Sequence, residues 1–494
     1  MEESSNIEIL RRLNHFNEWW GYGKVPERLV KPFRRRDFYK IKDISTKEKI
    51  TILIGPRRVG KTTLIRQIID YLIKKESPVN PKNILYAKMD DFLLRQATGS
   101  KLEVLMDVYA QNVLKTPFEK SKEDIYVFFD EIHKWENWQQ QLKDIFDQNY
   151  NIIFLVTGSS SPAIFKGGAT ALTGRYKTQV MLPMKFIDVL NMKMAKKSGD
   201  ELSIFDETCL NLRENLKLAV NSGEIKEFYM NLQAEFSSLS RFEKEIELHL
   251  KNYMIKGGYP ELYANDEIEL DECSDRLRDQ LQAILTKDIL EVFQVRNPAV
   301  ILDLFQMIGS QTAQIRKYTD LCEKLKITKA DTLKEYLGYL KETYLIGIAE
   351  LFSRNVDTSK KANKKIYVMD VGLRNVSLGL LNASLLDNKD DLGKVVETIV
   401  YDHCSRLKFN LDSSISIKPL FYWRHNGYEV DIIMPTTKNP IPIEVKYRKK
   451  TERKSIEAFL KRYNAPFGIE VTRDTLDMRE HTIYIPLWLF LIIC

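Results

Sequence analysis

Short apolar runs that alternate with helical patterns mark the first part of the chain. Residues 50–54, 125–129 and 152–156 are nearly uninterrupted apolar runs, which are typical of strands buried on both faces. Residues 64–72 carry apolar positions at helical spacing. This alternation predicts an α/β domain built on a parallel sheet.

The rest of the chain follows other patterns. Residues 191–295 have few β-branched runs and many Leu, Glu and Lys residues at helical spacing, so they predict a helical domain. Residues 296–357 predict three helices, the last two joined by a short turn, and then a strand, which is the order of a winged helix. Residues 358–494 predict a second α/β domain, in which a helix at 393–401 precedes three strands. The segment 201–240 carries no motif that points to chemistry.

Nine residues between the first apolar run and the first helical pattern carry the strongest chemical signal. They fit G-x-x-x-x-G-K-[ST], and a strand before and a helix after them are the context that a phosphate-binding loop requires. The glycines let backbone N–H groups surround phosphate oxygens, Lys61 reaches the β- and γ-phosphates, and the Thr62 hydroxyl ligates Mg²⁺. A surface glycine loop has no use for Lys61 and Thr62 at this spacing. We predict that ATP and Mg²⁺ bind at Gly55, Pro56, Arg57, Arg58, Val59, Gly60, Lys61, Thr62 and Thr63.

Polar residues at the ends of the next two runs complete this site. Asp130 is predicted to hold Mg²⁺ and Glu131 to act as general base, with simple solubility as the alternative. Thr157 and Ser159 follow the third run and are placed to sense the γ-phosphate or orient water, because ligands bind at the carboxyl ends of parallel strands. Arg175 is predicted to reach the same edge and to stabilise transition-state charge in cis or across a subunit boundary. An ordinary salt bridge is its alternative.

A second set of carboxylates lies in the C-terminal third. Glu444 and Lys446 point to one face of a predicted strand because side-chain direction alternates, and Asp431 lies on the preceding strand. With Glu397 on the predicted helix, Asp431 and Glu444 would hold Mg²⁺, while Lys446 orients water or steadies the leaving phosphate. A structural Asp–Lys ion pair within a sheet and a fold kept only for binding are the alternatives.

Basic residues lie in the predicted winged helix and beside the second set of carboxylates. Lys329, Thr332 and Lys334 are exposed candidates on the predicted recognition helix, although winged helices also dock proteins. A basic run beside the second carboxylate set suits a phosphate backbone or forms a solvated helix face. That run consists of Lys446, Arg448, Lys449, Lys450, Arg453 and Lys454.

Other side chains give weaker signals. His133 and His425 are single histidines near the acidic sites and are predicted to be local hydrogen bonders. Trp135 and Trp138 are predicted to pack rather than to stack on bases. The three arginines at 34–36 would contact nucleic acid or pair with the acidic N-terminus.

Composition narrows the class of protein. The 494 residues are 44% hydrophobic and 29% charged, as in globular proteins, and their number predicts about three domains. A net charge of +7 permits nucleic-acid binding without requiring it. Five scattered cysteines argue against a disulfide framework and a zinc site.

The two ends of the chain bear on its location. The start is acidic, unlike a secretory signal. The apolar run 488–493 is too short for a membrane helix and predicts a buried last strand. We expect a cytoplasmic protein with no membrane partner.

Several ordered motifs together resemble a prokaryotic group of AAA+-type ATPases, usually called ATP-binding proteins. The resemblance implies a P-loop AAA+ core with a helical lid. The C-terminal pattern of a helix-borne Glu, then Asp, then Glu-x-Lys is similar to the restriction-endonuclease-like fold and to archaeal Holliday-junction resolvases. The motifs lie at 55–63, 129–135, 157–161, 172–176, 181–186, 253–261 and 365–373, before the carboxylate-rich C-terminus.

These observations predict a multidomain α/β protein. The expected parts are an N-terminal segment (1–45), the P-loop AAA+ core (46–190), the helical lid (191–295), the winged helix (296–357) and the nuclease-like domain (358–494).

The leading functional hypothesis is an ATP-hydrolysing protein that acts on DNA, with Mg²⁺-dependent cleavage as a possible second activity. A nucleotide-controlled switch or scaffold is the main alternative, and a DNA-binding transcriptional regulator is a third. A homo-oligomer is compatible with each of them.

Overall fold

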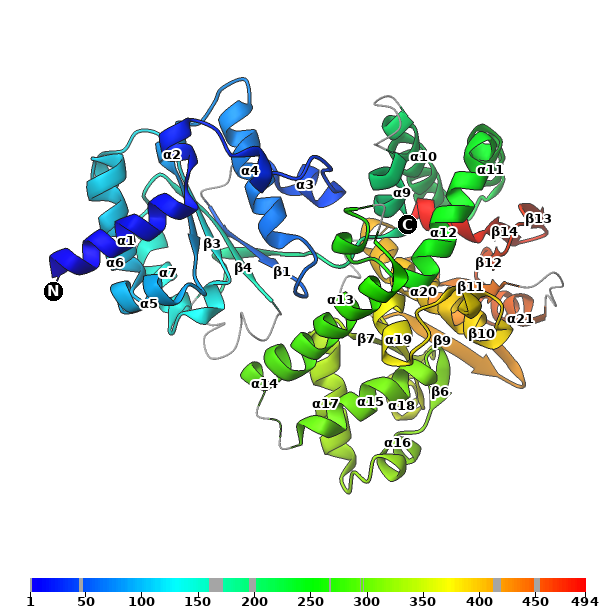
Figure 1. Cartoon of the computed structure of the whole chain (residues 1–494). Helices are drawn as coiled ribbons and strands as arrows, with labels where there is room; N and C mark the ends of the chain where they lie inside the picture. Colours follow the sequence, from blue (N-terminus) through cyan, green and yellow to red (C-terminus); the bar gives the residue numbers. More distant parts are fainter. Residues whose placement is uncertain are drawn as a thin grey trace. The chain divides into compact units, whose positions relative to one another are not determined.

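The computed structural model describes residues 2–43, 48–159, 172–194, 201–265, 268–293, 295, 297–411, 419–447 and 454–494 (Figure 1). The chain divides into two compact units. The first comprises Met1–Leu182 with Glu291–Gln294, and the second comprises Pro183–Leu290 with Val295–Cys494. The first division of the chain therefore falls at 182/183, eight residues before the boundary predicted at 190/191.

The first unit is built on a five-stranded sheet in the order β2-β3-β4-β1-β5. All neighbouring strands are parallel, and β1, β3 and β4 are buried along their whole length. The three strands predicted from apolar runs are therefore confirmed. The strands are β1 (Ile50–Ile54), β2 (Ile84–Lys88), β3 (Ile125–Asp130), β4 (Ile152–Gly158) and β5 (Tyr176–Val180).

The N-terminal segment is an integral part of this unit. Asn17 donates to the carbonyl oxygen of Tyr86 at 2.8 Å and accepts from its N–H at 2.7 Å, and the Trp20 indole donates to Ile84 O at 2.8 Å. These bonds satisfy the outer backbone edge of β2, which would otherwise be an unpaired sheet edge. The helices of this unit are α1 (Glu2–Phe16), α2 (Trp19–Tyr22), α3 (Arg36–Ile41), α4 (Lys61–Lys74), α5 (Phe92–Thr98), α6 (Leu102–Tyr109) and α7 (Trp138–Phe146).

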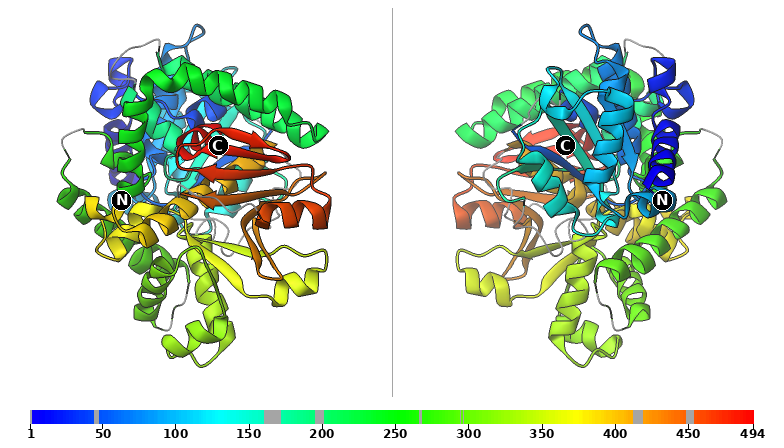
Figure 2. Two further views of the ribbon diagram at one scale, coloured as in Figure 1. Left: turned by 90° about the vertical axis from the view of Figure 1, so that its right-hand side faces the viewer. Right: turned by 90° about the vertical axis from the view of Figure 1, so that its left-hand side faces the viewer.

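The second unit contains a nine-stranded mixed sheet in the order β13-β14-β12-β11-β10-β9-β7-β8-β6. Figure 2 shows its strands in succession, from red through orange to yellow-green. The pairing of β7 with β9 is parallel and joins the strands of the predicted winged helix to those of the predicted nuclease-like domain. The strands are β6 (Gln314–Arg316), β7 (Ile346–Leu351), β8 (Lys364–Val368), β9 (Phe421–His425), β10 (Tyr428–Met434), β11 (Ile441–Lys446), β12 (Gly468–Thr472), β13 (Asp477–Arg479) and β14 (Thr482–Pro486).

Helices predicted in the middle of the chain are present, including two in the segment 201–240. The boundary predicted at 357/358 passes between β7 and β8, which pair antiparallel, so the two predicted domains share one sheet. The helices of this part are α9 (Phe186–Met194), α10 (Glu201–Ser222), α11 (Lys226–Leu239), α12 (Glu243–Lys256), α13 (Leu270–Ala283), α14 (Ile289–Val292), α15 (Pro298–Ser310), α16 (Tyr318–Lys324), α17 (Ala330–Glu342), α18 (Val356–Lys361), α19 (Val371–Ser377), α20 (Lys389–Leu411), α21 (Lys454–Tyr463) and α22 (Leu487–Ile493).

The apolar run near the C-terminus is a helix, and the prediction of a last strand is wrong. Every residue of α22 is buried, and the helix packs against α10, α9 and β14. Pro486 ends β14 and precedes the helix, where its missing N–H is tolerated. A short apolar run buried on all sides lacks the periodicity that separates helix from strand.

Two further properties of the fold concern its cysteines and the character of its helices. All five cysteines are free thiols. Among the helices in the described ranges, none combines the length and the apolar character needed to cross a membrane.

Candidate functional site

The predicted phosphate loop connects β1 to α4, and two glycines determine its shape. Gly60 has φ 102°, a left-handed conformation that side chains other than glycine rarely adopt. A Cβ atom on Gly55 would lie 1.9 Å from the carbonyl oxygen of Met181, the residue that follows β5. Any larger residue at position 55 would therefore displace either the loop or the end of β5.

Lys61 is the first residue of α4, and its side chain turns into the loop. Its Nζ donates to Gly55 O at 2.8 Å and to Pro56 O at 3.0 Å, and it lies 4.0 Å from Glu131 Oε1. The residue is 5% exposed. The ammonium is thus held inside the loop by groups that a phosphate oxygen would replace.

Asp130, the last residue of β3, accepts hydrogen bonds from three hydroxyl groups. Thr62 Oγ1 donates at 2.6 Å, Thr157 Oγ1 at 2.5 Å and the Tyr86 hydroxyl at 3.0 Å. Burial raises the pKa of Tyr86 well above its usual value, and the Asp130 charge adds to this effect, so the phenol keeps its proton and donates. Tyr86, on β2, is a site residue that the sequence prediction missed.

The Thr62–Asp130 pair fits the predicted Mg²⁺. A hydroxyl and a carboxylate are oxygen ligands of the kind that Mg²⁺ prefers, and this ion usually binds to one or two such groups plus phosphates and water. The two side chains are already within hydrogen-bond distance at the loop. The chemistry of this donor set therefore agrees with the prediction.

Glu131 follows Asp130 in a left-handed conformation with φ 59°. Its N–H donates to Thr157 Oγ1 at 2.9 Å, so Thr157 bridges both carboxylate-bearing residues. The Glu131 side chain is 24% exposed, whereas Asp130 is 1% exposed. Nearby, burial lowers the pKa of His133 to about 3, so this ring is neutral beside Glu131. Glu131 is thus the accessible carboxylate, as a general base must be, and its catalytic role stays a prediction.

Arg175 lies at the wrong edge of the sheet for the role predicted in cis. Its carbonyl oxygen pairs with the N–H of Ile50 at the beginning of β1, whereas the phosphate loop follows the end of that strand. Five strand residues span about 17 Å. The guanidinium forms a two-point ion pair with Asp147, at 2.7 and 3.2 Å. The salt-bridge alternative is therefore present, and a role across a subunit boundary stays a prediction.

Ser159 is buried directly after β4, at the carboxyl edge of the sheet where it was expected. Its proposed role in sensing phosphate stays a prediction.

Arg35 contacts the phosphate loop, a role that no local pattern indicated. Its guanidinium donates to Val59 O at 3.0 Å and to Leu182 O at 2.9 Å, and it pairs with Asp37 at 3.1 Å. The residue is 9% exposed. Arg35 therefore supports the loop, and nucleic-acid contact by the three arginines at 34–36 stays a prediction.

The C-terminal carboxylates also lie together, as predicted. Asp431 on β10 lies across from Glu444 on β11, one position beyond the Ile432–Ile443 pair. An extra residue in β10 between Val430 and Ile433 forms a bulge against β9 at this point, and bulges commonly redirect a side chain beside a site. Asp431 N donates to Glu444 Oε2 at 3.3 Å, and Val445 N donates to Asp431 Oδ2 at 3.0 Å.

A lysine that the sequence analysis overlooked occupies the middle of this centre. Lys365, on β8, is 1% exposed, and its Nζ lies 2.7 Å from Glu397 Oε1, 2.9 Å from Asp431 Oδ1 and 3.4 Å from Glu429 Oε1. Tyr367, two residues later, donates to Glu397 Oε1 at 2.8 Å. We define Lys365, Glu397, Asp431, Glu444 and Lys446 as the carboxylate centre.

The predicted Mg²⁺ site at Glu397, Asp431 and Glu444 does not fit this arrangement. Both oxygens of Asp431 are engaged, by Lys365 and by Val445 N. Both oxygens of Glu444 are engaged as well, by Lys446 Nζ at 2.6 Å and by Asp431 N. Within the described ranges, no group of three or more His, Cys, Asp or Glu residues is arranged to hold a metal ion. The residues as they lie in this structure therefore do not fit the predicted metal, and Lys446 pairs with Glu444 rather than with the aspartate of the structural alternative.

The charges of the carboxylate centre are unequal. Burial would lower the pKa of Lys365, but Asp431 and Glu397 outweigh this effect, and the pKa stands well above its usual value. Burial, with the Asp431 charge, raises the pKa of Glu397 to about 7 and that of Glu444 to about 8. The Lys365 charge lowers both pKa values, and the Lys446 charge lowers that of Glu444, but neither offsets the effect of burial.

The weaker signals mostly agree with local packing. His425 Nε2 lies 2.9 Å from Arg462 Nη1, and the Trp135 indole donates to Met89 O at 2.8 Å. Trp135 and Trp138 are both buried. Of the predicted basic run, Arg448, Lys449, Lys450 and Arg453 lie outside the described residues.

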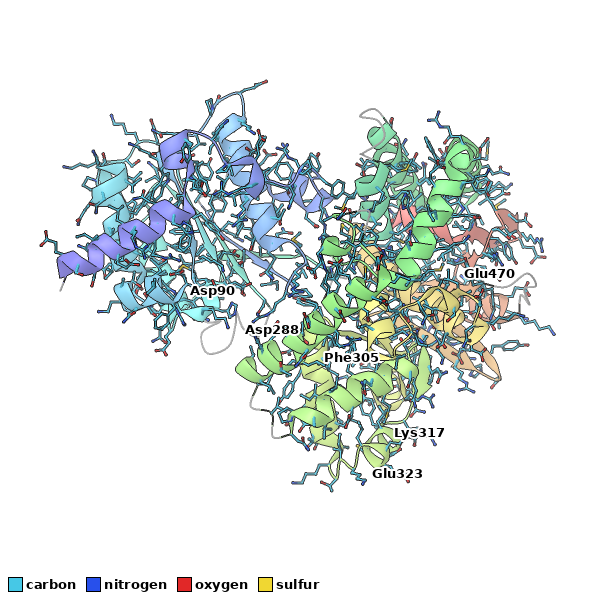
Figure 3. All side chains as sticks on the ribbon, in the orientation of Figure 1. Asp90, Asp288, Phe305, Lys317, Glu323 and Glu470 are labelled. Atoms are coloured by element: carbon cyan, nitrogen blue, oxygen red, sulfur yellow. The ribbon has the colours of Figure 1, made fainter. Side chains whose placement is uncertain are left out.

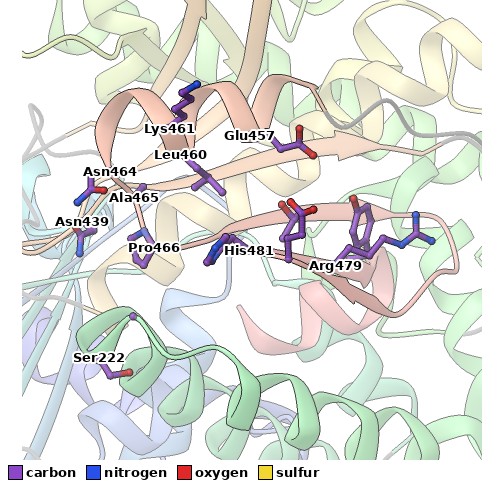
Figure 4. A pocket seen from close by; sticks show the side chains of 14 residues that line it. Ser222, Asn439, Glu457, Leu460, Lys461, Asn464, Ala465, Pro466, Arg479 and His481 are labelled. Carbon is purple, nitrogen blue, oxygen red and sulfur yellow. The ribbon is translucent and has the colours of Figure 1, made fainter.

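A cavity of about 650 Å³ lies elsewhere in the second unit, between the end of α10, α21 and the β13–β14 hairpin (Figure 4). Its lining includes Glu457, Lys461 and Arg479, so both signs of charge face it. None of the predicted site residues is among the described residues that line it. Its composition does not define a ligand.

Comparison with known families agrees with a nucleotide site in the first unit. Residues 47–190 match a family model described as an AAA domain. Residues 247–384 match a domain of unknown function (DUF8612), and residues 392–490 match another (DUF4143). The resemblance to nucleases thus receives no support from these matches.

The chain is also similar to relatives along most of its length and to solved structures. Two uncharacterised proteins of Methanocaldococcus jannaschii are each 25% identical, one over 89% of this chain and 87% of its own length, the other over 97% and 90%. The walker-type ATPase of Pyrococcus abyssi has a TM-score of 0.38 at 14% identity and covers 72% of this chain and 97% of its own. The Aeropyrum pernix ORC2 protein, solved as ADPNP–ADP complexes, has a TM-score of 0.38 at 11% identity over 72% and 95%.

Structural likeness at these scores carries no argument about this chain. The family match stands on its own and coincides with the loop geometry. Residues 47–190 are thus similar to the AAA domain family.

Proposed function

We propose that this protein is a Mg²⁺-dependent ATPase that couples ATP hydrolysis to work on DNA. The observation that carries the ATPase part is the convergence of Lys61, Thr62, Asp130, Glu131 and Thr157 at one edge of the parallel sheet. Two strands, β3 and β4, and one helix, α4, bring these groups together, so their meeting depends on the fold of the first unit.

Each side chain has a defined task in this proposal. Lys61 exchanges its loop carbonyl partners for β- and γ-phosphate oxygens. Thr62 and Asp130 would hold Mg²⁺, which would supply positive charge for the transferring phosphoryl group. Glu131 orients and deprotonates the attacking water, and Thr157 keeps Glu131 and Asp130 in register.

The DNA part rests on the second unit. From α15 to β8 the elements follow the order helix, strand, helix, helix, strand, short helix (α18) and strand, with β6 and β7 both pairing antiparallel with β8. This order supports the winged-helix interpretation.

Basic side chains lie on the surface of this part. Figure 3 labels Phe305 on α15, which is fully buried, and Lys317 and Glu323 at the two ends of α16. Exposed lysines lie around α16 and the start of α17, namely Lys317, Lys324, Lys326 and Lys329.

The test is the ATPase rate of the full chain with and without linear, single-stranded and four-way DNA. We expect Mg²⁺-dependent turnover that rises severalfold with at least one DNA, and that Lys61→Ala abolishes. Lys324→Glu with Lys329→Glu should remove the stimulation and leave the basal rate unchanged, because both lysines are exposed and remote in sequence from the loop. Turnover that no DNA changes would refute the DNA part.

One observation favours a nucleotide-controlled switch that binds a protein instead. The helix α17 with its preceding residue carries three basic side chains (Lys329, Lys334, Lys341) and three acidic ones (Asp331, Glu335, Glu342), and Lys334 pairs with Asp331 at 2.9 Å. A helix that tracks phosphates would carry a net positive face. Tightly held nucleotide, slow hydrolysis and no response to DNA would favour the switch.

A further inference from the structure

The carboxylate centre contains a built-in cation, and its position is the basis for a further inference. The Lys365 ammonium contacts three carboxylates from two elements, one on α20 and two on β10, while the lysine itself extends from β8. At 1% exposure, it is buried to nearly the same extent as the apolar core residues. Buried carboxylates without a counter-charge are strongly unfavourable.

We infer that Lys365 permanently takes the place of a divalent metal ion in the carboxylate centre, so that the C-terminal domain neither binds Mg²⁺ there nor cuts DNA. A metal ion at this position would need carboxylate oxygens at about 2.1 Å and several water ligands. The ammonium already takes one oxygen each of Glu397 and Asp431 at 2.7 and 2.9 Å.

The neighbouring contacts hold the lysine in this position. Tyr367 points to the same face of β8 two residues on, donates to Glu397 and stacks on Tyr401 with ring centroids 3.9 Å apart. The adjacent Lys364 takes a different course, and its Nζ donates to Ser359 O at 2.9 Å and lies 3.7 Å from Glu350 Oε1. Because side-chain direction alternates along β8, Lys365 points to the carboxylate centre and Lys364 points to α18.

The centre also joins two parts of the second unit. The strand β8 belongs to the β6–β8–β7 group of the winged-helix interpretation, whereas Glu397 and Asp431 lie on α20 and β10 of the predicted nuclease-like domain. A lysine contributed by one part therefore balances the charge of the other. In this arrangement the residues that resemble a nuclease site form a buried salt-bridge network that links the two parts.

The experiment measures Mn²⁺ binding to the nucleotide-free full chain by electron paramagnetic resonance, in a Thr62→Ala background that disables the ATPase site. The parent should show no specific site. Lys365→Ala should gain one specific Mn²⁺ site that binds about tenfold or more tightly than the non-specific binding of the parent, and adding Asp431→Asn should remove it. Lys364→Ala is the matched control, because it deletes a neighbouring lysine of the same strand, and it should gain no site.

Specific Mn²⁺ binding by the parent that Asp431→Asn abolishes would overturn the inference, and so would a Lys365→Ala protein that folds and gains no site. If Lys365→Ala does not fold, Lys365→Met keeps most of the side-chain volume, and the parent measurement stands in any case. This inference refines the proposed DNA function, but its test involves neither DNA nor ATP. Failure of DNA to stimulate the ATPase would therefore leave the Mn²⁺ result unaffected.

Discussion

At the scale of single residues, Asp130 shows how the ATPase site is organised. One buried carboxylate accepts from Thr62, Thr157 and Tyr86, which belong to three different elements. Hydrogen bonds to a charged acceptor contribute about 1.5–3 kcal/mol each. The position of the carboxylate is therefore fixed before nucleotide binds.

Removal of one of these donors should affect both stability and turnover. We expect Tyr86→Phe to lower the free energy of unfolding by about 1.5–3 kcal/mol and to reduce kcat more than it raises KM for ATP. Urea unfolding and steady-state ATPase assays measure the two effects. Tyr109→Phe is a matched control, because that buried hydroxyl donates to Lys82 O instead, and it should lower stability while kcat stays unchanged.

The accessible carboxylate should separate binding from chemistry. Glu131→Gln keeps the size of the side chain and its backbone bond to Thr157 but removes the base, so we expect ATP affinity within a few-fold of the parent. The hydrolysis rate should fall by about 10²-fold or more. Single-turnover hydrolysis and equilibrium nucleotide binding provide the check. A parallel loss of affinity would show that Glu131 serves the fold of the loop and not the reaction.

Asp370 predicts a pH dependence of stability in the second unit. It precedes α19 and accepts from Gly258 N at 2.8 Å and Leu373 N at 3.0 Å, and burial raises its pKa to about 6. Since an unfolded Asp titrates near pH 4, the folded state holds a proton that the unfolded state has lost. Stability should therefore fall by about 3 kcal/mol as pH rises from 4 to above 6.

Urea unfolding of the second unit, measured across this pH range, tests that expectation. Asp370→Asn cannot titrate, so its stability should decline less steeply over the same interval, whatever its absolute value. Equal slopes for the two proteins would mean that Asp370 does not contribute.

At the scale of elements, sequence patterns were reliable where period or motif was distinct. The strand, glycine loop and helix around Lys61 could be predicted because each has its own signature within twenty-five residues. The helix α22 could not, because an apolar run buried on all faces has no period. Arg35, Tyr86 and Lys365 were missed because their partners lie 24 or more positions away in sequence. Only the folded sheet brings them to their sites.

Because α22 is a core helix, its side chains should be costly to remove. Phe490 is fully buried, and we expect Phe490→Ala to lower the free energy of unfolding by about 3–5 kcal/mol. Phe409→Ala makes the same chemical change at a side chain that is 50% exposed, and it should have much less effect. Chemical denaturation measures both. Similar small effects would contradict a core role for α22.

At the scale of the whole molecule, the division into two compact units predicts two unfolding transitions. Only the first unit contains the phosphate loop, so Mg²⁺ and ATP analogue at about 100 times Kd should stabilise that transition by about 2.7 kcal/mol. Differential scanning calorimetry with and without the nucleotide gives the shift, and Lys61→Ala should abolish it. A single transition that shifts with nucleotide would indicate that the two units unfold together.

The close approach of Gly55 to Met181 has a practical consequence. The main chain at residue 181 forms one wall of the nucleotide loop, and Leu182, the next residue, accepts the Arg35 bond that supports the same loop. An excised ATPase fragment must therefore retain the chain through Leu182. Truncation just before β5 would leave the glycine motif complete in sequence but would remove the backbone against which it is shaped.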